Sequence, residues 1–400
     1  MKFHPHLITS VTGILLEWMK TGRYIDQLIE SDFRGNKRRG ANDRRFIAQM
    51  TYDAVRYWRL LWTVAGKEPT PEPESVHTIL AVLFLIKEKS IPPLREFAGL
   101  PVDDYKKRYE ESLTDRSLRE SIPEWLDQYG VAQLQERWDA EAAAMNDPAP
   151  VVIRVNLLKT DLASLRAELA EEGVETTESD LADAGLVLTE RKNVFALPQF
   201  RDGKFEVQDT ASQLVAPFME VQPGMRVIDA CAGAGGKTLH IATLMRNKGR
   251  VIAMDVSEAK LQELKRRHRR QGIDIIQTRQ IVTQKDIQRL SEGADRVLLD
   301  VPCSGSGVIR RNPDTKWKLT LEKIGLLIQE QREILTRYSR MVKPGGKLIY
   351  ATCSLFPAEN QENVAFFLQH HPEFLLETES VLTPASMGTD GFYMARLKRL

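Results

Sequence analysis

The sequence predicts an α/β protein in which a helical bundle and a small α+β connector precede a doubly wound, mainly parallel sheet. Three observations predict this. Apolar residues recur at helical spacing through residues 1–145. A linker with two prolines, Asn-Asp-Pro-Ala-Pro, follows at residues 146–150. From about residue 206, short apolar strand-like runs alternate with helical segments, which is typical of a parallel sheet with helices on both faces.

Composition limits the class of protein. A chain of 400 residues with 42% hydrophobic and 28% charged residues is typical of a globular protein of two or three domains. It has no apolar run of about 18 residues and no basic-then-apolar N-terminus, so neither a membrane span nor a signal peptide is expected. Three cysteines are too few for a disulfide framework, which indicates a cytoplasmic protein. The net charge is +1, so any nucleic-acid-binding surface must be local.

The first segment, residues 1–145, is expected to be a helical bundle. Ile8, Val11, Leu15 and Trp18 fall at helical spacing, and a second such series runs from Phe46 to Leu61. Residues 76–86 are nearly all apolar, which predicts a central, buried helix. No strand-like alternation stands out in this segment.

A dense run of cations lies between the first helices of this segment. Gly35 and Gly40 make the run loop-like, and Asp43 alone opposes it. Two interpretations stay open, because such a run suits both a solvated turn and a contact with the phosphates of a nucleic acid. The cations are Arg34, Lys37, Arg38, Arg39, Arg44 and Arg45.

The connector, residues 146–205, reads as a small α+β unit. Strands are expected at 151–155, 186–188 and 194–197, and an amphipathic helix at 162–170. The pattern does not distinguish a simple connector from a surface that faces RNA.

The last segment, residues 206–400, is expected to hold the parallel sheet. Strands are predicted at 226–230, 251–255, 296–300 and 347–351, with a shorter one within 275–282 and helices between them. Residues 392–397 are predicted to form a terminal, antiparallel edge strand. The basic tract at 265–270 is interpreted as a solvated helix face rather than a specific site, with attraction of phosphates as the alternative.

A glycine turn follows the first of these strands. Asp229 marks the end of the strand, and Gly233, Gly235 and Gly236 allow the backbone to turn tightly and to approach a ligand. A phosphate-binding P-loop is excluded, because its first glycine would fall at Cys231. The spacing of a dinucleotide-binding turn does not match either, whereas Gly-x-Gly-Gly beside a carboxylate suits S-adenosylmethionine.

The next strand supports a nucleoside ligand. It ends at Asp255, which lies 19 residues after Gly236, close to the spacing of about 20 at which an acid accepts the hydroxyls of a ribose. The turn by itself leaves open an ordinary ligand-free connection between strand and helix.

Two cysteines follow later strands of the sheet. Cys303 comes after the strand at 296–300 and Cys353 after the strand at 347–351, so both are expected at the edge where ligands bind. A single cysteine is usually a small buried hydrophobe, and a metal site would need further ligands beside them. Together with a methyl donor, the pair suggests another reaction. A thiolate that adds to carbon-6 of cytosine makes carbon-5 nucleophilic, and a second acid–base group then helps to release the product.

Four segments resemble the RsmB/Nop family of RNA cytosine-5 methyltransferases. Residues 300–317 resemble its motif IV, Thr352-Cys353-Ser354 with Pro357, Glu359 and Asn360 resembles motif VI, and residues 231–238 resemble motif I. Gln208-Asp209 with Ser212-Gln213 resembles the segment that leads into the fold. The resemblance covers about residues 122–400, and the helical segment is more weakly similar to the NusB-like RNA-binding domain of bacterial members.

The resemblance implies a Rossmann-like class I methyltransferase fold with S-adenosylmethionine as cofactor. It implies that Cys353 is the nucleophile and that Cys303 assists release, with Asp300 and Lys237 beside the base and the methyl group. The cofactor site would comprise Cys231, Ala232, Gly233, Ala234, Gly235, Gly236, Lys237, Asp255 and Asp300.

The sequence departs from the family at two places. Ala234 stands where members often have proline. The acid that usually follows the third strand is missing, because residues 281–284 read Ile-Val-Thr-Gln and Asp286 comes late. The contact to the adenine side of the cofactor is therefore unassigned.

The sequence thus predicts a monomeric RNA cytosine-5 methyltransferase, with 16S ribosomal RNA as the expected substrate and no metal or membrane partner. Transfer RNA is the first alternative substrate. A non-catalytic RNA-binding assembly factor is the second alternative, and the presence of Lys237, Asp300, Cys303 and Cys353 together disfavours it. A small-molecule methyltransferase would need neither the helical segment nor two cysteines.

Overall fold

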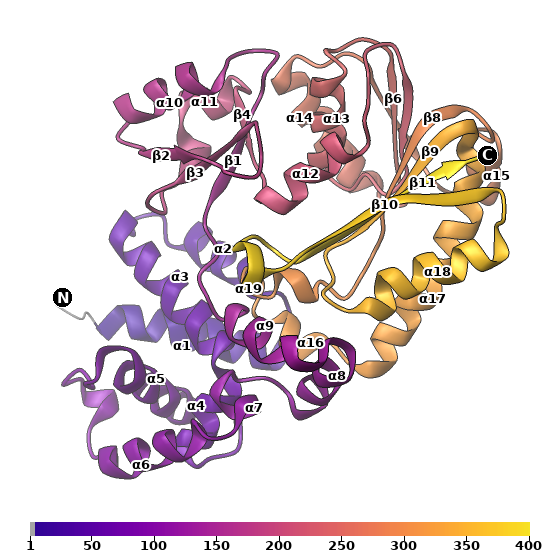
Figure 1. Ribbon diagram of the computed structural model, residues 1–400. Coiled ribbons are helices and arrows are strands. Elements are labelled where there is room, and N and C mark those ends of the chain that lie inside the picture. The colour runs from indigo at the N-terminus through magenta and orange to yellow at the C-terminus, as the bar shows by residue number, and fades with distance from the viewer. Residues whose placement is uncertain (1–4) are drawn as a thin grey trace. The chain divides into compact units, whose positions relative to one another are not determined.

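The computed structural model describes residues 5–400, which form two compact units (Figure 1). The helical unit comprises the chain up to Asn146 together with Asn312–Leu319. The sheet unit comprises Asp147–Arg311 and Thr320–Leu400. The predicted connector, residues 146–205, therefore falls within the same compact unit as the large sheet.

The described part of the helical unit contains helices and no strand, as predicted. The predicted spacing is confirmed in the first helix, where Ile8, Val11, Leu15 and Trp18 are all buried. The predicted central helix is also confirmed, because every residue from Val76 to Leu85 except His77 is buried. The helices are α1 (Pro5–Thr21), α2 (Ile25–Gly35), α3 (Ala41–Arg56), α4 (Trp58–Ala65), α5 (Pro73–Glu88), α6 (Val102–Ser112), α7 (Arg116–Arg119), α8 (Glu124–Leu134), α9 (Trp138–Ala144) and α16 (Thr315–Lys318).

The segment Asn312–Leu319 corrects the predicted boundary, which placed all of residues 206–400 in the sheet domain. Lys316 is fully buried in the helical unit, where its Nζ donates to Asn146 Oδ1 at 2.7 Å and to the carbonyl of Glu120 at 3.0 Å. Trp317 Nε1 donates to the carbonyl of Val55 at 2.7 Å. Local patterns cannot reveal this placement, because the partners of both side chains lie far earlier in the chain.

Replacing Lys316 with methionine should destabilise the helical unit. The change removes the donor to Asn146 and to the carbonyls of Arg56, Glu120 and Ser121, and a buried acceptor without a partner costs about 1–3 kcal/mol. We expect the free energy of unfolding in urea to fall by about 3 kcal/mol, because more than one acceptor loses its partner. Lys107→Met, at an exposed position of α6, is the matched control. Equal stability of the two variants would contradict a structural role for Lys316.

The smaller sheet of the sheet unit has the strand order β2-β3-β1-β4, with every pair antiparallel. The predicted strand at 194–197 is wrong, because Val194–Ala196 forms a 3-10 turn that the Asn193 side chain caps. Strand β4 crosses the predicted domain boundary at residue 205. The elements are β1 (Val152–Val155), β2 (Thr176–Glu178), β3 (Gly185–Leu188), β4 (Phe205–Val207), α10 (Leu162–Glu171) and α11 (Pro198–Arg201).

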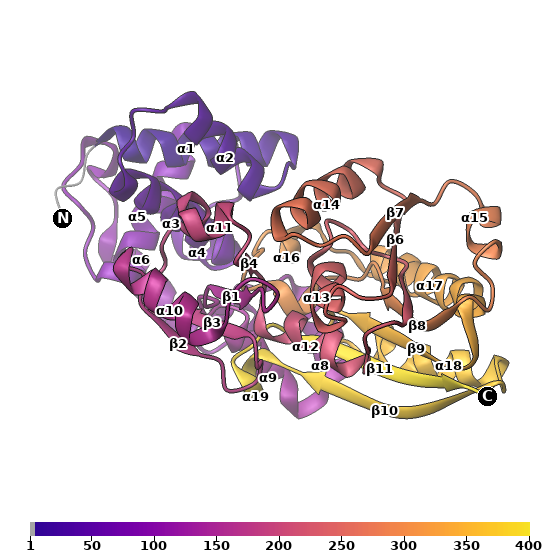
Figure 2. The same cartoon turned by 90° about the horizontal axis from the view of Figure 1, so that it is seen from above.

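The larger sheet has the order β10-β11-β9-β8-β5-β6-β7, and Figure 2 shows the strands running from β10 at one edge to β7 at the other. Strands β5 to β9 pair in parallel, whereas β11 is antiparallel to β9. All the predicted strands of this sheet are present. They are β5 (Arg226–Asp229), β6 (Arg250–Asp255), β7 (Ile276–Gln280), β8 (Ala294–Asp300), β9 (Val342–Thr352), β10 (Phe374–Leu382) and β11 (Phe392–Arg399).

The position of β11 corrects one prediction. It is antiparallel, as predicted, but it is not the edge strand, because β10 pairs along its outer side. Most residues of β10 are exposed, and Glu377 and Glu379 interrupt its apolar character. The sequence of β10 therefore lacks the apolar run by which the inner strands were found.

Helices cover both faces of the larger sheet (Figure 1). Alternate strand residues point to opposite faces, so Val227 and Val251 pack with α12, α13 and α14, whereas Ile228 and Ile252 pack with α15, α17 and α18. This is the predicted doubly wound arrangement. The helices are α12 (Thr210–Phe218), α13 (Gly236–Leu244), α14 (Glu258–Gln271), α15 (Gln284–Gln288), α17 (Leu321–Tyr338), α18 (Gln361–His370) and α19 (Pro384–Met387).

Candidate active site

The glycine turn joins β5 to α13 at the carboxyl edge of the sheet. Gly233 and Gly235 have φ values of 54° and 89°, in the left-handed region that favours glycine. A Cβ atom on Gly235 would lie 2.0 Å from Leu264 Cδ1, so this glycine is also required for packing against α14. A Cβ on Gly233 would meet no atom within 4 Å, and one on Gly236 would meet only Gln208 Nε2, at 3.8 Å. The backbone is therefore open to a ligand at Gly233 and Gly236.

Asp255 lies beside this open backbone. Its Oδ2 accepts a hydrogen bond from Gly233 N and its Oδ1 accepts one from Ser257 N, both at 2.8 Å. A carboxylate oxygen has two acceptor sites, so each oxygen can accept one further donor, such as a ribose hydroxyl. The backbone of the glycine turn therefore holds Asp255, the acid predicted at the end of the strand, beside the expected position of the ligand.

Asp229 lies at the end of β5 and is 1% exposed. Its Oδ2 accepts a hydrogen bond from Thr238 Oγ1 at 2.6 Å. Burial raises the pKa of Asp229 to about 7, although the Thr238 hydrogen bond opposes the change. This carboxyl group therefore changes its charge near neutral pH, directly beneath the glycine turn.

Lys237 and Asp300 link the glycine turn to the next strand of the sheet. Lys237 Nζ lies 2.7 Å from Asp300 Oδ2 and 4.8 Å from the centre of the Phe392 ring. Burial lowers the pKa of Lys237, but the charge and hydrogen bond of Asp300 outweigh burial and raise it overall. The Lys237 side chain therefore remains an ammonium at neutral pH and holds the Asp300 carboxylate.

Cys303 and Cys353 are in contact beyond the ends of β8 and β9. Asp300 and Ala351 are paired residues of these strands, and the two Sγ atoms lie 3.4 Å apart. The contact with Cys353 is the largest cause that raises the pKa of Cys303 well above its usual value, and burial adds to it. The structure thus brings together the two cysteines that the sequence placed at one edge of the sheet.

Cys231, the third cysteine, lies in the glycine turn and is not part of this pair. Burial raises the pKa of Cys231 well above its usual value, and the charges of Asp229, Asp300 and Asp255 add to the rise. Its thiol therefore remains protonated at neutral pH. A neutral thiol is a poor nucleophile, so Cys231 is better suited to lining the expected cofactor site.

Glu359 connects the two cysteine loops. It is fully buried, and its Oε1 accepts a hydrogen bond from Ser304 N at 2.8 Å while its Oε2 accepts one from Ser354 Oγ at 2.5 Å. Gln331 Nε2 donates to the same Oε1 at 3.0 Å. Ser304 and Ser354 each follow a cysteine, so one carboxylate fixes the spacing of both thiols. The sequence showed Glu359 only as part of a family motif.

Two arginines that were not predicted as site residues hold the glycine turn. Arg154, which is 2% exposed, donates to the carbonyl of Gly236 at 2.7 Å, and Arg267 donates to the carbonyl of Ala234 at 2.7 Å. The interpretation of residues 265–270 as a solvated face is therefore partly wrong, because Arg267 and Arg270 turn inward to the buried Glu206. Their three-residue spacing places them on one helix face with the buried Leu264.

Asp286 has a local role in the loop after β7. Its Oδ2 accepts hydrogen bonds from Val282 N at 3.1 Å and Thr283 N at 2.9 Å, which completes a capping box at the start of α15. Asp286 therefore does not replace the family's acid at this position, and the adenine-side contact stays unassigned.

Comparison with known proteins identifies the family. The family model described as 16S rRNA methyltransferase RsmB/F matches residues 216–398, and the ferredoxin-like domain of the same proteins matches residues 122–195. A protein of Synechocystis sp. named probable ribosomal RNA small subunit methyltransferase B is 31% identical over 414 residues, which cover 89% of this chain and 91% of that protein. The chain belongs to the RsmB/F family of RNA methyltransferases.

A second relative and the solved structures agree with this assignment. The Bacillus subtilis protein of the same name is 33% identical over 296 residues, which cover 70% of this chain and 65% of that protein. The solved structure of PH0851 superposes with a TM-score of 0.85 at 28% identity and covers all of both chains. The solved structure of a methyltransferase homolog from Pyrococcus horikoshii superposes with a TM-score of 0.64 at 28% identity and covers 72% of this chain and 99% of that one. The predicted Rossmann-like class I methyltransferase fold is therefore confirmed.

S-adenosylmethionine is the methyl donor of this RsmB/F protein. The open backbone at Gly233 and Gly236 and the free acceptor sites of Asp255 fit a nucleoside with an amino-acid tail. Within residues 5–400, no cluster of side chains suits a metal ion. No helix in the same range has the length and apolar character to cross a bilayer.

Replacing Asp255 with alanine should weaken binding of the donor. A hydrogen bond to a charged group contributes about 1.5–3 kcal/mol, so we expect the affinity to fall roughly ten- to a hundredfold. Calorimetry with S-adenosylhomocysteine measures this without turnover. Asp286→Ala is the matched control, because its carboxylate caps a helix instead. Unchanged affinity in Asp255→Ala would rule out the ribose contact.

Proposed function

We propose that this protein methylates carbon-5 of a cytosine in 16S ribosomal RNA through a covalent cysteine adduct. The observation that carries the proposal is the contact of Cys303 and Cys353, whose Sγ atoms lie 3.4 Å apart beside the Lys237–Asp300 pair. Methylation of an exocyclic amine or a ribose needs no thiol, whereas methylation of carbon-5 needs a nucleophile at carbon-6. The small-subunit substrate is supported by the description of the matched family and by the names of the relatives.

Cys353 is proposed as the nucleophile. Its thiolate adds to carbon-6 of a cytosine that has been turned out of any stack, and the electrons of the 5,6 double bond move into the ring. Asp300 lies at the end of β8 with its carboxylate held by Lys237. The ring nitrogen of the adduct takes up a proton from solvent, and the Asp300 carboxylate can then accept a hydrogen bond from that N–H group. S-adenosylmethionine, when bound, supplies the electrophilic methyl group for carbon-5.

Cys303 is proposed to complete the reaction. Its contact with Cys353 is the main cause of its raised pKa. Once Cys353 is bonded to carbon-6, its sulfur is a neutral thioether, which no longer opposes a negative charge on Cys303. The Cys303 thiol then loses its proton to solvent more readily, and its thiolate can remove the proton from carbon-5. The electrons of that carbon–hydrogen bond restore the 5,6 double bond, and Cys353 leaves as a thiolate. One thiol therefore serves as nucleophile and the other as base.

The test uses small-subunit RNA from a strain that lacks the gene. The purified protein and labelled donor should methylate this RNA, and bisulfite sequencing should show one cytosine that resists conversion only after treatment. Transfer RNA from the same strain and a mixture of metabolites are the comparison substrates. Labelling of purines or of metabolites, or no labelling of any RNA, would refute the proposal.

A further inference from the structure

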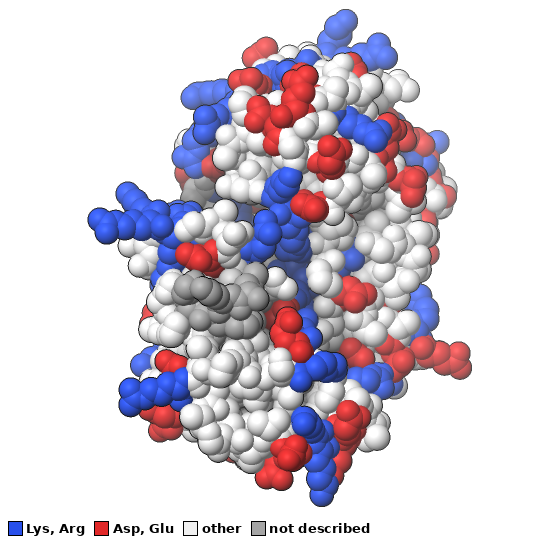
Figure 3. Space-filling model, turned by 90° about the vertical axis from the view of Figure 1, so that its left-hand side faces the viewer, with Lys and Arg blue, Asp and Glu red and all other residues white. Residues whose placement is uncertain are grey.

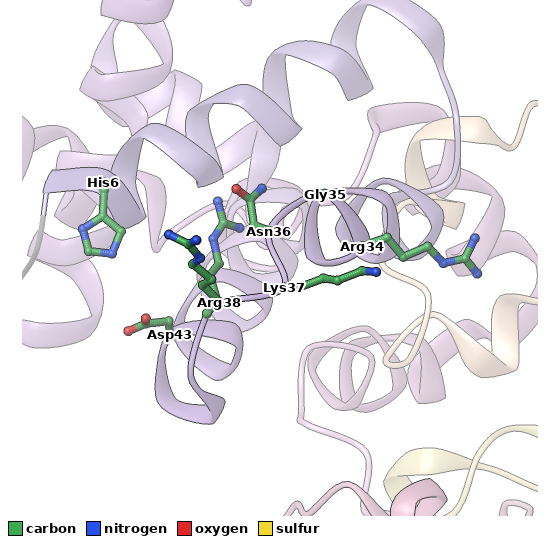
Figure 4. Close-up of a pocket in the computed structure, with 8 residues that line it drawn as sticks. His6, Arg34, Gly35, Asn36, Lys37, Arg38 and Asp43 are labelled. Carbon is green, nitrogen blue, oxygen red and sulfur yellow. The ribbon is translucent and has the colours of Figure 1, made fainter.

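A hollow in the helical unit lies at the loop between α2 and α3, and the proposed chemistry does not use it. Its volume is about 640 Å³. Figure 4 shows the side chains around it. Four of the six cations of the dense run between residues 34 and 45 line this hollow. The lining residues are His6, Arg34, Gly35, Asn36, Lys37, Arg38, Arg39 and Asp43.

The loop is held in place by its own side chains. Arg39 forms an ion pair with Asp32 and donates to Ser10 Oγ at 2.6 Å. Asn36 Nδ2 donates to the carbonyl of Asp32 at 3.0 Å, and Arg44 Nε donates to the carbonyl of Arg39 at 3.2 Å. These bonds disfavour the interpretation of the run as a loosely solvated turn.

Two cations of the hollow remain without an ion-pair partner among residues 5–400. Arg34 pairs with Glu30 at 2.5 Å, and Arg39 pairs with Asp32. Lys37 and Arg38 are exposed and have no such carboxylate, although Asp43 lies in the same lining. Figure 3 shows cations and carboxylates interspersed over parts of one face of the molecule. Lys37 and Arg38 are therefore two adjacent cations that remain available to an anionic partner.

The two side chains extend in different directions. In Figure 4, the Lys37 side chain extends toward the side on which Arg34 lies. The Arg38 side chain lies on the opposite side, with His6 and Asp43. A single small anion would not engage both. A chain that carries a phosphate at each nucleotide can pass over the loop and meet one cation with each of two phosphates.

We infer that the loop between α2 and α3 is a binding site for the phosphate backbone of the substrate RNA, with Lys37 and Arg38 as its two phosphate contacts. The inference depends on the proposed function only in that RNA is the substrate. It does not depend on which atom is methylated. Phosphate contacts position a nucleic acid without reading its sequence, so the site contributes affinity and not the choice of cytosine.

The experiment measures RNA binding as a function of salt for the full-length protein. The probe is unmethylated small-subunit RNA without methyl donor, so a failure of the carbon-5 chemistry does not affect the result. The variant is Lys37→Gln with Arg38→Gln. Each phosphate contact with a single strand contributes about 0.7 to the slope of log affinity against log salt, so the slope should become shallower by about 1.4. Between about 50 and 200 mM salt, the wild type should then lose roughly sevenfold more affinity than the variant.

Lys106→Gln with Lys107→Gln is the matched control. It removes the same charge from two adjacent exposed positions of the helical unit, but these lysines lie within reach of Asp103 and Glu111. The control should keep the slope of the wild type. The maximal methylation rate at saturating RNA should stay unchanged in both double variants.

Two results would overturn the inference. One is a slope that is unchanged in the Lys37/Arg38 variant or reduced equally in the control. The other is unchanged RNA binding together with a loss of binding to vesicles of anionic lipid, which would assign the loop to a membrane surface. Melting temperatures show that the variants are folded, and the single changes at Lys37 and Arg38 should each reduce the slope by about half of the total.

Discussion

Replacing Cys303 with alanine should leave substrate RNA bonded to the protein through Cys353. The variant keeps the nucleophile and the Lys237–Asp300 pair, so attack at carbon-6 and methyl transfer can proceed. It lacks the thiolate that removes the proton from carbon-5, so the carbon–sulfur bond cannot break by the proposed route. Turnover should fall by at least about a hundredfold, in keeping with the contribution of about 10²–10⁴ from a positioned acid or base.

Denaturing gel electrophoresis with labelled RNA measures this adduct. A slowly migrating band is expected in Cys303→Ala and not in Cys353→Ala or in the double variant. Cys231→Ala is the matched control, since its thiol lies in the glycine turn, outside the reacting pair. It should turn over RNA without accumulating an adduct.

Other gel patterns would change the assignment. An adduct in Cys353→Ala but not in Cys303→Ala would make Cys303 the nucleophile. If no variant formed an adduct and activity survived both single changes, the covalent mechanism would be wrong.

Replacing Glu359 with alanine should lower turnover by about a hundredfold, even though the residue has no proposed contact with RNA or cofactor. Its carboxylate holds Ser304 N and Ser354 Oγ, which follow Cys303 and Cys353 directly. Without it, the two thiols lose their fixed spacing, and a displacement of about 1 Å in an active site can cost about 10²-fold in rate.

The readout separates a positioning role from general destabilisation. Glu359→Ala should lower kcat with little change in KM for RNA or in donor affinity, and a denaturing gel should show slower formation of the adduct in a Cys303→Ala background. Glu359→Gln is the conservative variant. It keeps the length and one acceptor oxygen, so it should recover most of the activity. If both variants were folded and fully active, Glu359 would have no positioning role.

The sequence by itself determined much of the fold, because the signals for it are local. Each inner strand of the larger sheet is buried on both faces and reads as an apolar run, as in residues 251–254, and the strands predicted from such runs after residue 206 are all present. The turn into α13 needs glycine at a positive φ, so the ligand turn is visible in the chain itself. Ligand-binding residues follow the ends of parallel strands, and this rule alone assigns Asp255, Asp300, Cys303 and Cys353 to one edge of the sheet.

Features that depend on residues far apart in the chain could be determined only from the tertiary structure. Strand β10 is mostly exposed and charged, so only its pairing with β11 identifies it as the edge. Lys316 and Trp317 lie in the helical unit because Asn146 and Val55, far earlier in the chain, accept their hydrogen bonds, and no local pattern encodes such partners.

The same distinction applies to the candidate site. Sequence placed the two cysteines at one edge, but only the structure shows their 3.4 Å contact and the buried carboxylate of Glu359 that fixes it. The basic tract of α14 shows the limit most clearly. Its consecutive basic residues look alike in sequence, whereas the helix turns Arg267 toward the glycine turn and leaves Arg266 in solvent. Residue type sets which chemistry a position can perform, and the geometry of the folded chain decides which positions meet.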